Sequence, residues 1–148
     1  MGRDRRTCWR RCARPSGTDL FYLDTSAAVK LVFFEPESAA LRSWWDAADD
    51  QVVSSDLLRT ELLRVTRRVD SEQMTRARGL LDSLILLKLS TAVCERAVML
   101  DPVVLRSLDA LHLAAALELG DEMEGVVTYD RRLADGARAL GIRAIAPG

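Results

Sequence analysis

The stretch LFYLDTSAA at residues 20–28 decides the fold of this chain. Its four apolar residues, Leu20–Leu23, predict a short buried strand, and Asp24 follows at the point where a helical segment begins. The stretch VVTYDRRLA at residues 126–134 has the same plan, with Asp130 following its strand. Ligands of open α/β sheets bind at the carboxyl ends of the strands. Two aspartates at such ends, far apart in the sequence, therefore predict one acidic pocket built from distant pieces of the chain.

Short apolar runs alternate with segments of helical periodicity along the rest of the chain. Further strands are expected at residues 51–54, 86–89, 126–129 and 142–144, and Lys88 favours an edge position for the strand that contains it. Helices are expected at residues 27–34, 37–48, 55–69, 71–84, 91–102, 107–120 and 131–140, with Ser107 as the N-cap of the one that it begins. This alternation predicts an α/β fold in which a parallel sheet of about five strands has helices on both faces.

The composition is that of a soluble globular protein, with 49% hydrophobic and 29% charged residues in a chain of 148. No apolar stretch approaches the roughly 18 residues that a membrane-spanning helix needs. Residues 1–18 differ from the rest, because six arginines and one aspartate give them a net charge of +5. The whole chain carries −1, so residues 19–148 carry −6 and are expected to form the globular domain. The basic segment is expected to be a disordered tail or a start assigned too early, and an RNA-binding arm is the alternative.

The three cysteines, Cys8, Cys12 and Cys94, are an odd number, and two of them fall in the basic segment. This disfavours a disulfide framework and indicates a reducing, cytoplasmic setting. A metal site at Cys8 and Cys12 would need more ligands, and the only histidine, His112, is distant in the sequence.

Two further acids lie on predicted helices. Glu61 shares one helix face with Leu57, Leu58, Leu62 and Val65, and Asp109 shares another with Leu105, Leu108, His112 and Ala116. A glutamate on an apolar stripe must be paired, protonated or bound to a cation, unless it reaches water at the edge of the stripe. Each of the other acids also has an ordinary structural interpretation: Asp24 and Asp130 can be helix N-caps, and Asp109 can be a partner of the helix dipole.

All four acids are compatible with one site, because two stand at strand ends and two lie on helices that can pack beside those ends. Four carboxylates in one pocket repel each other unless a cation neutralises them. Hard divalent cations prefer oxygen ligands, and the absence of a nearby Cys/His set disfavours zinc. The site is therefore expected to hold Mg²⁺ or Mn²⁺ and to favour phosphoryl chemistry.

Four segments in this order resemble the PIN-domain ribonucleases, and most closely the VapC-type toxins of bacterial toxin–antitoxin pairs: LDTSA (23–27), TEL (60–62), LDALHLAAA (108–116) and VTYDRRL (127–133). The resemblance covers about residues 20–146 and implies a three-layer α/β/α sandwich. It also implies a metal-dependent endoribonuclease that hydrolyses RNA phosphodiesters. The implied catalytic and metal-binding acids are Asp24, Glu61, Asp109 and Asp130, and the implied supporting residues are Thr25, Ser26 and Thr128. The arginine-rich start departs from the family, whose members usually begin within a few residues of the first strand.

Other families with acidic sites fit less well. Phosphatases of the haloacid dehalogenase type want a second aspartate two residues after the first, where this chain has Ser26. Response-regulator receiver domains need a late lysine, and the only lysines here are Lys30 and Lys88. A catalytically silent PIN-like module that binds RNA or a partner protein remains the alternative to an enzyme.

An acidic domain needs local basic patches to hold RNA. Candidate RNA contacts are Arg64, Arg67 and Arg68 on the helix that carries Glu61, together with Arg131 and Arg132 after Asp130; a solvated, salt-bridged surface is the alternative. The resemblance also implies a cognate antitoxin and a homodimer. Trp44 and Trp45 are adjacent, so one is expected in the core. The resemblance places the other at a groove for the antitoxin, and simple surface packing is the alternative.

Overall fold

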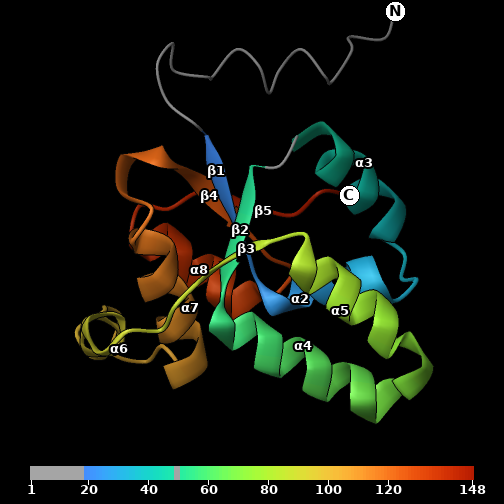
Figure 1. Ribbon diagram of the computed structural model, residues 1–148. Coiled ribbons are helices and arrows are strands. Elements are labelled where there is room, and N and C mark those ends of the chain that lie inside the picture. The colour runs from blue at the N-terminus through green and yellow to red at the C-terminus, as the bar shows by residue number, and fades with distance from the viewer. Residues whose placement is uncertain (1–18, 49–50) are drawn as a thin grey trace, which may run out of the picture.

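The computed structural model describes residues 19–48 and 51–148, and it contains one five-stranded sheet whose strands are all parallel (Figure 1). The strands are β1 (Leu20–Leu23), β2 (Val52–Ser55), β3 (Ile85–Leu87), β4 (Met123–Val127) and β5 (Ala144–Ile145), in the order β3-β2-β1-β4-β5. The chain builds the sheet from β1 toward one edge and then continues on the other side of β1. The strand order therefore reverses at β1, and in open α/β sheets ligands bind at such a point.

Helices cover both faces of the sheet, as the alternation predicts (Figure 1). One buried cluster contains side chains of α2 (Thr25–Val32), α3 (Ser38–Ala48), α4 (Asp56–Val69) and α5 (Met74–Asp82). The other contains side chains of α6 (Thr91–Val98), α7 (Ser107–Leu117) and α8 (Arg131–Ala139). Two 3-10 turns, η1 (Ser71–Gln73) and η2 (Gly120–Glu122), complete the described elements.

Side chains of β1 alternate between the two faces of the sheet. Phe21 and Leu23 pack against the cluster that involves α2 to α5, whereas Leu20 and Tyr22 pack against the cluster that involves α6 to α8. Helices cover both faces, so a central strand of this kind is apolar throughout. The first residue after β1, Asp24, then lies at the carboxyl edge of the sheet.

The expected elements are present, and several boundaries differ for identifiable reasons. Helix α2 begins at Thr25, two residues earlier than expected, because Asp24 is its N-cap and accepts a bond from the Ser26 N–H. Strand β4 begins at Met123, three residues earlier than expected. Gly125 interrupts the apolar pattern of the sequence but belongs to the strand. A Cβ at Gly125 would lie 2.8 Å from the carbonyl oxygen of Arg143, so glycine permits the close approach of the chain before β5.

Two local expectations are corrected. Ser107 is the first helical residue of α7, and the N-cap is Arg106, whose side chain makes no capping hydrogen bond. Neither Trp44 nor Trp45 lies in the core as expected for one of them, because both are half-buried against the first cluster. Trp44 packs edge-on against Phe21, with 5.2 Å between the ring centroids.

The expectations for residues 1–18, including Cys8 and Cys12, lie outside the described residues. Cys94 is exposed and carries a free thiol. In the part of the chain that the structure describes, no helix has the length and apolar character needed to cross a membrane.

Candidate active site

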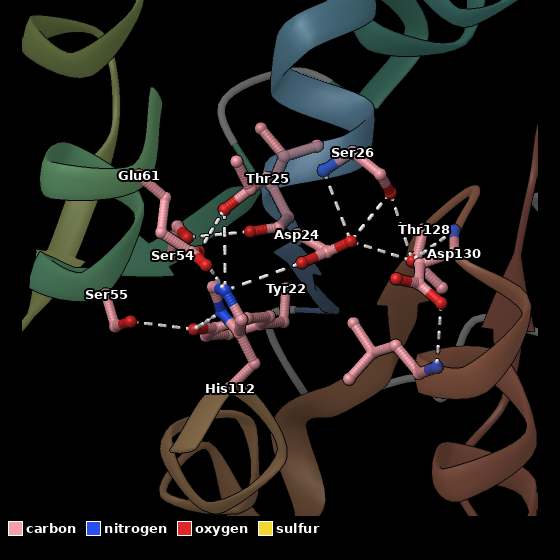
Figure 2. Close-up of polar contacts among 12 residues, drawn as sticks. Tyr22, Asp24, Thr25, Ser26, Ser54, Ser55, Glu61, His112, Thr128 and Asp130 are labelled. Carbon is pink, nitrogen blue, oxygen red and sulfur yellow. Dashed lines mark hydrogen bonds and ion pairs between the residues drawn. The ribbon is translucent and has the colours of Figure 1, made fainter. Parts of the chain in front are cut away.

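Strand pairing brings two of the predicted acids to one edge of the sheet. Strands β1 and β4 are neighbours, with Leu23 opposite Val127, so the residues after both strands emerge together. The Asp24 N–H donates to the Val127 carbonyl at 3.0 Å. The Thr128 hydroxyl donates to Asp24 Oδ2 at 2.8 Å and accepts from the Asp130 N–H at 3.1 Å, so a single threonine connects the two acids (Figure 2).

The buried carboxylate of Asp24 is held through one of its oxygens. Oδ2 accepts bonds from the Ser26 N–H at 3.2 Å, the Ser26 hydroxyl at 2.6 Å and the Thr128 hydroxyl at 2.8 Å. Oδ1 lies 3.5 Å from Nε2 of His112, on the other side of the group (Figure 2). The N-cap interpretation of Asp24 is therefore confirmed, and capping occupies only one of its two oxygens.

Glu61 is paired rather than exposed. Its Oε2 accepts a short hydrogen bond of 2.5 Å from the Thr25 hydroxyl and lies 2.7 Å from Nε2 of His112 (Figure 2). The side chain of His112 is 3% exposed and that of Glu61 is 22% exposed, so this contact is largely shielded from water. Helix α4 supplies the glutamate and helix α7 the histidine, and their packing around the end of β1 brings both to Asp24.

The second ring nitrogen of His112 extends the network into the core. Its Nδ1 lies 2.9 Å from the hydroxyl of Tyr22, and that hydroxyl donates to Ser55 Oγ at 2.8 Å. With the Tyr22 proton directed toward Ser55, the Tyr22 oxygen is free to accept a hydrogen bond from Nδ1. In this arrangement both ring nitrogens face acceptors, Glu61 Oε2 and the Tyr22 oxygen, and this environment favours the charged imidazolium, which donates from both nitrogens.

The pKa directions agree with this protonation state. Burial by itself lowers the pKa of His112, but the hydrogen bond to Glu61 and the charges of Asp24, Glu61 and Asp109 outweigh it, so the pKa lies above its ordinary value. Burial raises the pKa of Glu61, yet the hydrogen bonds from His112 and Thr25 bring it below its ordinary value. Burial also raises the pKa of Tyr22, which keeps this phenol a neutral donor.

Asp109 and Asp130 form the outer part of the site. Burial and then the charges of Asp130 and Asp24 raise the pKa of Asp109, against the opposing influence of Arg132 and His112. Asp130 is the N-cap of α8, where its Oδ1 accepts from the Arg132 N–H at 2.8 Å and the Leu133 N–H at 3.4 Å. Asp109 is thus close enough to two other aspartates to be perturbed by them.

The four acids collect at one end of the sheet, but they do not form a closed cage. Among residues 19–48 and 51–148, no group of three His, Cys, Asp or Glu side chains is already arranged around a point that could hold a metal. The predicted supporting residues have defined contacts: Thr25 bonds Glu61, while Ser26 and Thr128 bond Asp24. The candidate RNA contacts lie in two places. Arg64, Arg67 and Arg68 line a groove on α4, and Arg131 lines a cavity of about 390 Å³ beside Asp130.

Sequence reasoning missed the partner of Glu61. The sequence puts His112 on the same helix face as Asp109 but does not by itself pair it with Glu61. Two signals pointed to it: a glutamate on an apolar stripe needs a partner, and His112 is the only histidine. Tyr22 and Ser55 were also missed, although the hydroxyl of a buried tyrosine usually finds a hydrogen-bond partner.

Comparison with known proteins identifies the family. Residues 21–139 match the PIN domain family. Ribonuclease VapC47 of Mycobacterium tuberculosis is 44% identical over 133 residues, which cover 87% of this chain and 98% of that protein. Ribonuclease VapC46 of the same species is 42% identical over 126 residues, which cover 85% of this chain and 96% of that protein.

Solved structures share the fold at low sequence identity. The crystal structure of M. tuberculosis VapC20, described as a sarcin–ricin loop cleaving toxin, has a TM-score of 0.70 at 17% identity and covers 86% of this chain and 99% of that chain. A chain of DNA-bound VapBC from Salmonella typhimurium has a TM-score of 0.69 at 18% identity, and the match covers 86% of this chain and 97% of that chain. These likenesses confirm the expected α/β fold, and the matches in sequence confirm the resemblance. The chain belongs to the PIN-domain family, among the VapC-type ribonucleases that serve as toxins of toxin–antitoxin systems.

Proposed function

We propose that this chain hydrolyses RNA phosphodiester bonds with Mg²⁺ or Mn²⁺ held by Asp24, Asp109, Asp130 and Glu61. Its family is typically metal-dependent, and the choice of cation and ligands for this chain is our inference. The observation that carries it is the electrostatic conflict at Asp109, whose pKa is raised by Asp130 and Asp24 in addition to burial. A divalent cation relieves such a conflict.

The donor set fits a hard cation. All four proposed ligands offer carboxylate oxygens, and the one histidine in the site is committed to Glu61 and Tyr22. Bonds to Ser26 and Thr128 fix Asp24 through Oδ2, which leaves Oδ1 as the oxygen available for a cation. Mg²⁺ typically uses few protein carboxylates and keeps several waters, so an open cluster suits it better than a closed cage.

The protein side chains have distinct tasks in this proposal. When bound, the cation would polarise a phosphate and lower the pKa of a water. His112 and Thr25 hold Glu61 ionised and fix its Oε2, so that the carboxylate does not swing away from Asp24. Burial of Tyr22 and His112 keeps water from competing for these hydrogen bonds.

Local positive charge supports RNA as the substrate. Arg131 and Arg132 are exposed at the start of α8, next to Asp130, and are proposed to contact the RNA near the cleaved bond. Arg64, Arg67 and Arg68 lie further along α4 and are proposed as contacts of a more distant part of the strand. Arginine suits this task because its planar guanidinium binds phosphate oxygens bidentately.

We also propose a cognate antitoxin protein as partner, a homodimer as the assembled state and the cytoplasm as the location. Support for the partner comes from a structural neighbour that is described as a DNA-bound VapBC complex. The half-buried pair Trp44 and Trp45 on α3 stays a candidate for the antitoxin contact.

Cleavage of RNA by the purified protein tests this function. Single-stranded RNA should be cut with Mg²⁺ or Mn²⁺ and should remain intact with a chelator. Asp24→Asn should remain folded, because asparagine is an equally good N-cap, and should lose cleavage. Undiminished cleavage by Asp24→Asn would remove this acid from the mechanism, and RNA binding without cleavage by the wild-type chain would favour the silent binding module.

A further inference from the structure

A basic groove lies between α4 and α5, and none of the four acids of the site lines it. The two helices contact each other and are connected through η1, from which they spread apart in Figure 1. The groove has a volume of about 560 Å³, and its lining includes Arg64, Arg67 and Arg68 from α4, Arg78 from α5, and the apolar side chains Leu63 and Met74. We call this the α4–α5 groove.

The arginines of the α4–α5 groove are not paired with acids in the described structure. Among residues 19–48 and 51–148, none of its four arginines takes part in an ion pair or a side-chain hydrogen bond. The acid that follows α4, Asp70, is used in capping, because it accepts bonds from the Glu72 N–H and the Gln73 side chain. Four like charges around one groove repel each other, and a polyanion would remove that cost.

Stabilisation of helix ends explains the positions of only two of these four arginines. Arg67 and Arg68 lie in the last turn of α4, where a positive charge interacts favourably with the helix dipole. Arg64 lies before that turn, and Arg78 comes from a different helix. The dipole therefore does not explain why side chains from two helices bring their charges to one groove.

On α4 the lining of the groove starts at Thr60, directly beside Glu61. Glu61 and Arg64 are three residues apart and lie on neighbouring positions of the helix surface. At 1.5 Å per residue, Arg67 stands about 9 Å beyond Glu61 along the helix axis. A strand held at the carboxylates can thus extend along α4 over the arginines.

We propose that the α4–α5 groove binds the phosphate backbone of single-stranded RNA on one side of the bond that is cut. The proposal rests on the proposed function for the identity of that bond, and it adds a binding site outside the acidic pocket. Single-stranded RNA is favoured over a protein segment, because the groove is basic and runs from the proposed nuclease site. Contacts to phosphates make the affinity independent of sequence and dependent on salt.

The test measures binding in a protein that does not cut. Asp24→Asn is combined with Arg67→Gln and Arg78→Gln, and affinity for a fluorescent single-stranded RNA is measured by anisotropy at several salt concentrations. The matched control combines Asp24→Asn with Arg59→Gln and Arg76→Gln, which removes two exposed arginines from the same two helices outside the groove lining. Melting temperatures establish that both variants are folded.

The groove variant should bind RNA about tenfold more weakly than the Asp24→Asn parent. A plot of the logarithm of its association constant against the logarithm of the salt concentration should be shallower by about 1.4, or roughly 0.7 per lost phosphate contact. The control should bind as the parent does. Equal losses in both variants would show a diffuse charge effect and overturn the proposal. So would unchanged RNA binding with a selective loss of binding to poly-glutamate, since that result assigns the groove to an acidic protein segment. A wild-type chain that fails to cut RNA, but whose binding depends on Arg67 and Arg78, would refute the proposed function and leave the groove in place.

Discussion

His112 and Glu61 form an ion pair with 2.7 Å between Nε2 and Oε2, at the meeting point of two helices that are distant in the sequence. Removing one partner of such a pair leaves the other charge without compensation in a partly dry site. The imidazole also lies 3.5 Å from Asp24 Oδ1, so it contributes positive charge to the acidic pocket. The site therefore contains its own partial neutralisation before any cation binds.

Replacing His112 by glutamine should lower the free energy of unfolding by about 1–3 kcal/mol, the cost of leaving a buried polar group poorly paired. Chemical denaturation of His112→Gln, Glu61→Gln and the double variant forms a cycle that isolates the pair. The double variant should lose less than the two single losses combined. Strictly additive losses would show that the two side chains do not stabilise each other.

The stability contributed by this pair should depend on pH. The pKa of His112 is raised on folding, so its contribution is complete below the ordinary value of 6.5 and is lost as pH rises through the folded value. The pKa of Glu61 is lowered, so its contribution is complete above the ordinary value of 4.5 and is lost as pH falls through the folded value. The stability difference between wild type and His112→Gln should thus be largest between pH 4.5 and 6.5 and should shrink in alkali. A difference that grows above pH 8 would contradict the charged state of His112.

Thr128 should act on metal affinity through Asp24. Thr128→Val removes the donor to Asp24 Oδ2 and the acceptor of the Asp130 N–H while keeping the shape of the side chain. Loss of such an orienting group typically costs about 10–100-fold in metal affinity. Cleavage should therefore need more Mg²⁺ and recover at high concentration, whereas Thr128→Ser should behave as wild type. An unchanged Mg²⁺ dependence in Thr128→Val would show that its hydroxyl does not orient the site.

Deleting residues 1–17 should leave melting temperature and cleavage nearly unchanged, because this segment offers no periodic apolar face in the sequence. Thermal denaturation and an RNA cleavage assay on the shortened chain check this. A large drop in melting temperature would mean that the domain boundary near residue 19 is wrong.

The positions of Asp24 and Asp130 were predictable because they depend on local signals. An apolar run followed by an acid and a helix places the acid at a strand end, and parallel strands bring their carboxyl ends to one edge. The start of β4 was harder, because Gly125 interrupts the apolar pattern and its reason is a contact with the chain at Arg143. Ser107 resembled an N-cap in the sequence, but the helix begins one residue earlier than that role requires.

The pairing of Glu61 with His112 depends on how α4 and α7 pack, and no local pattern encodes that packing. The sequence shows that the helix faces with Glu61 and His112 are partly apolar. It does not show that Glu61 has a positively charged partner. The structure separates the acids: the pKa of Glu61 is lowered by His112 and Thr25, while that of Asp109 is raised by burial and by Asp130 and Asp24. Four repelling carboxylates are expected to raise the pKa of at least one of them; Asp109 meets this expectation, whereas the hydrogen bonds from His112 and Thr25 lower the pKa of Glu61.

The central claim is that Asp109 belongs to a cation site and is not only a partner of the α7 dipole. Its pKa is raised on folding, so the folded form binds more protons and this group destabilises the metal-free protein as pH rises above the ordinary value of 3.8. Asp109→Asn should therefore be at least as stable as wild type at pH 7 without metal.

The most direct measurement is a set of melting curves of wild type and Asp109→Asn at pH 7, each with a chelator and with saturating Mg²⁺. Binding to the folded state alone stabilises by RT ln(1 + [L]/Kd), or about 2.7 kcal/mol at a hundredfold excess over Kd. We expect Mg²⁺ to raise the melting temperature of wild type clearly more than that of Asp109→Asn. If Asp109→Asn is markedly less stable than wild type without metal and Mg²⁺ shifts neither protein, Asp109 is a structural residue of α7 and the proposed cation site is wrong.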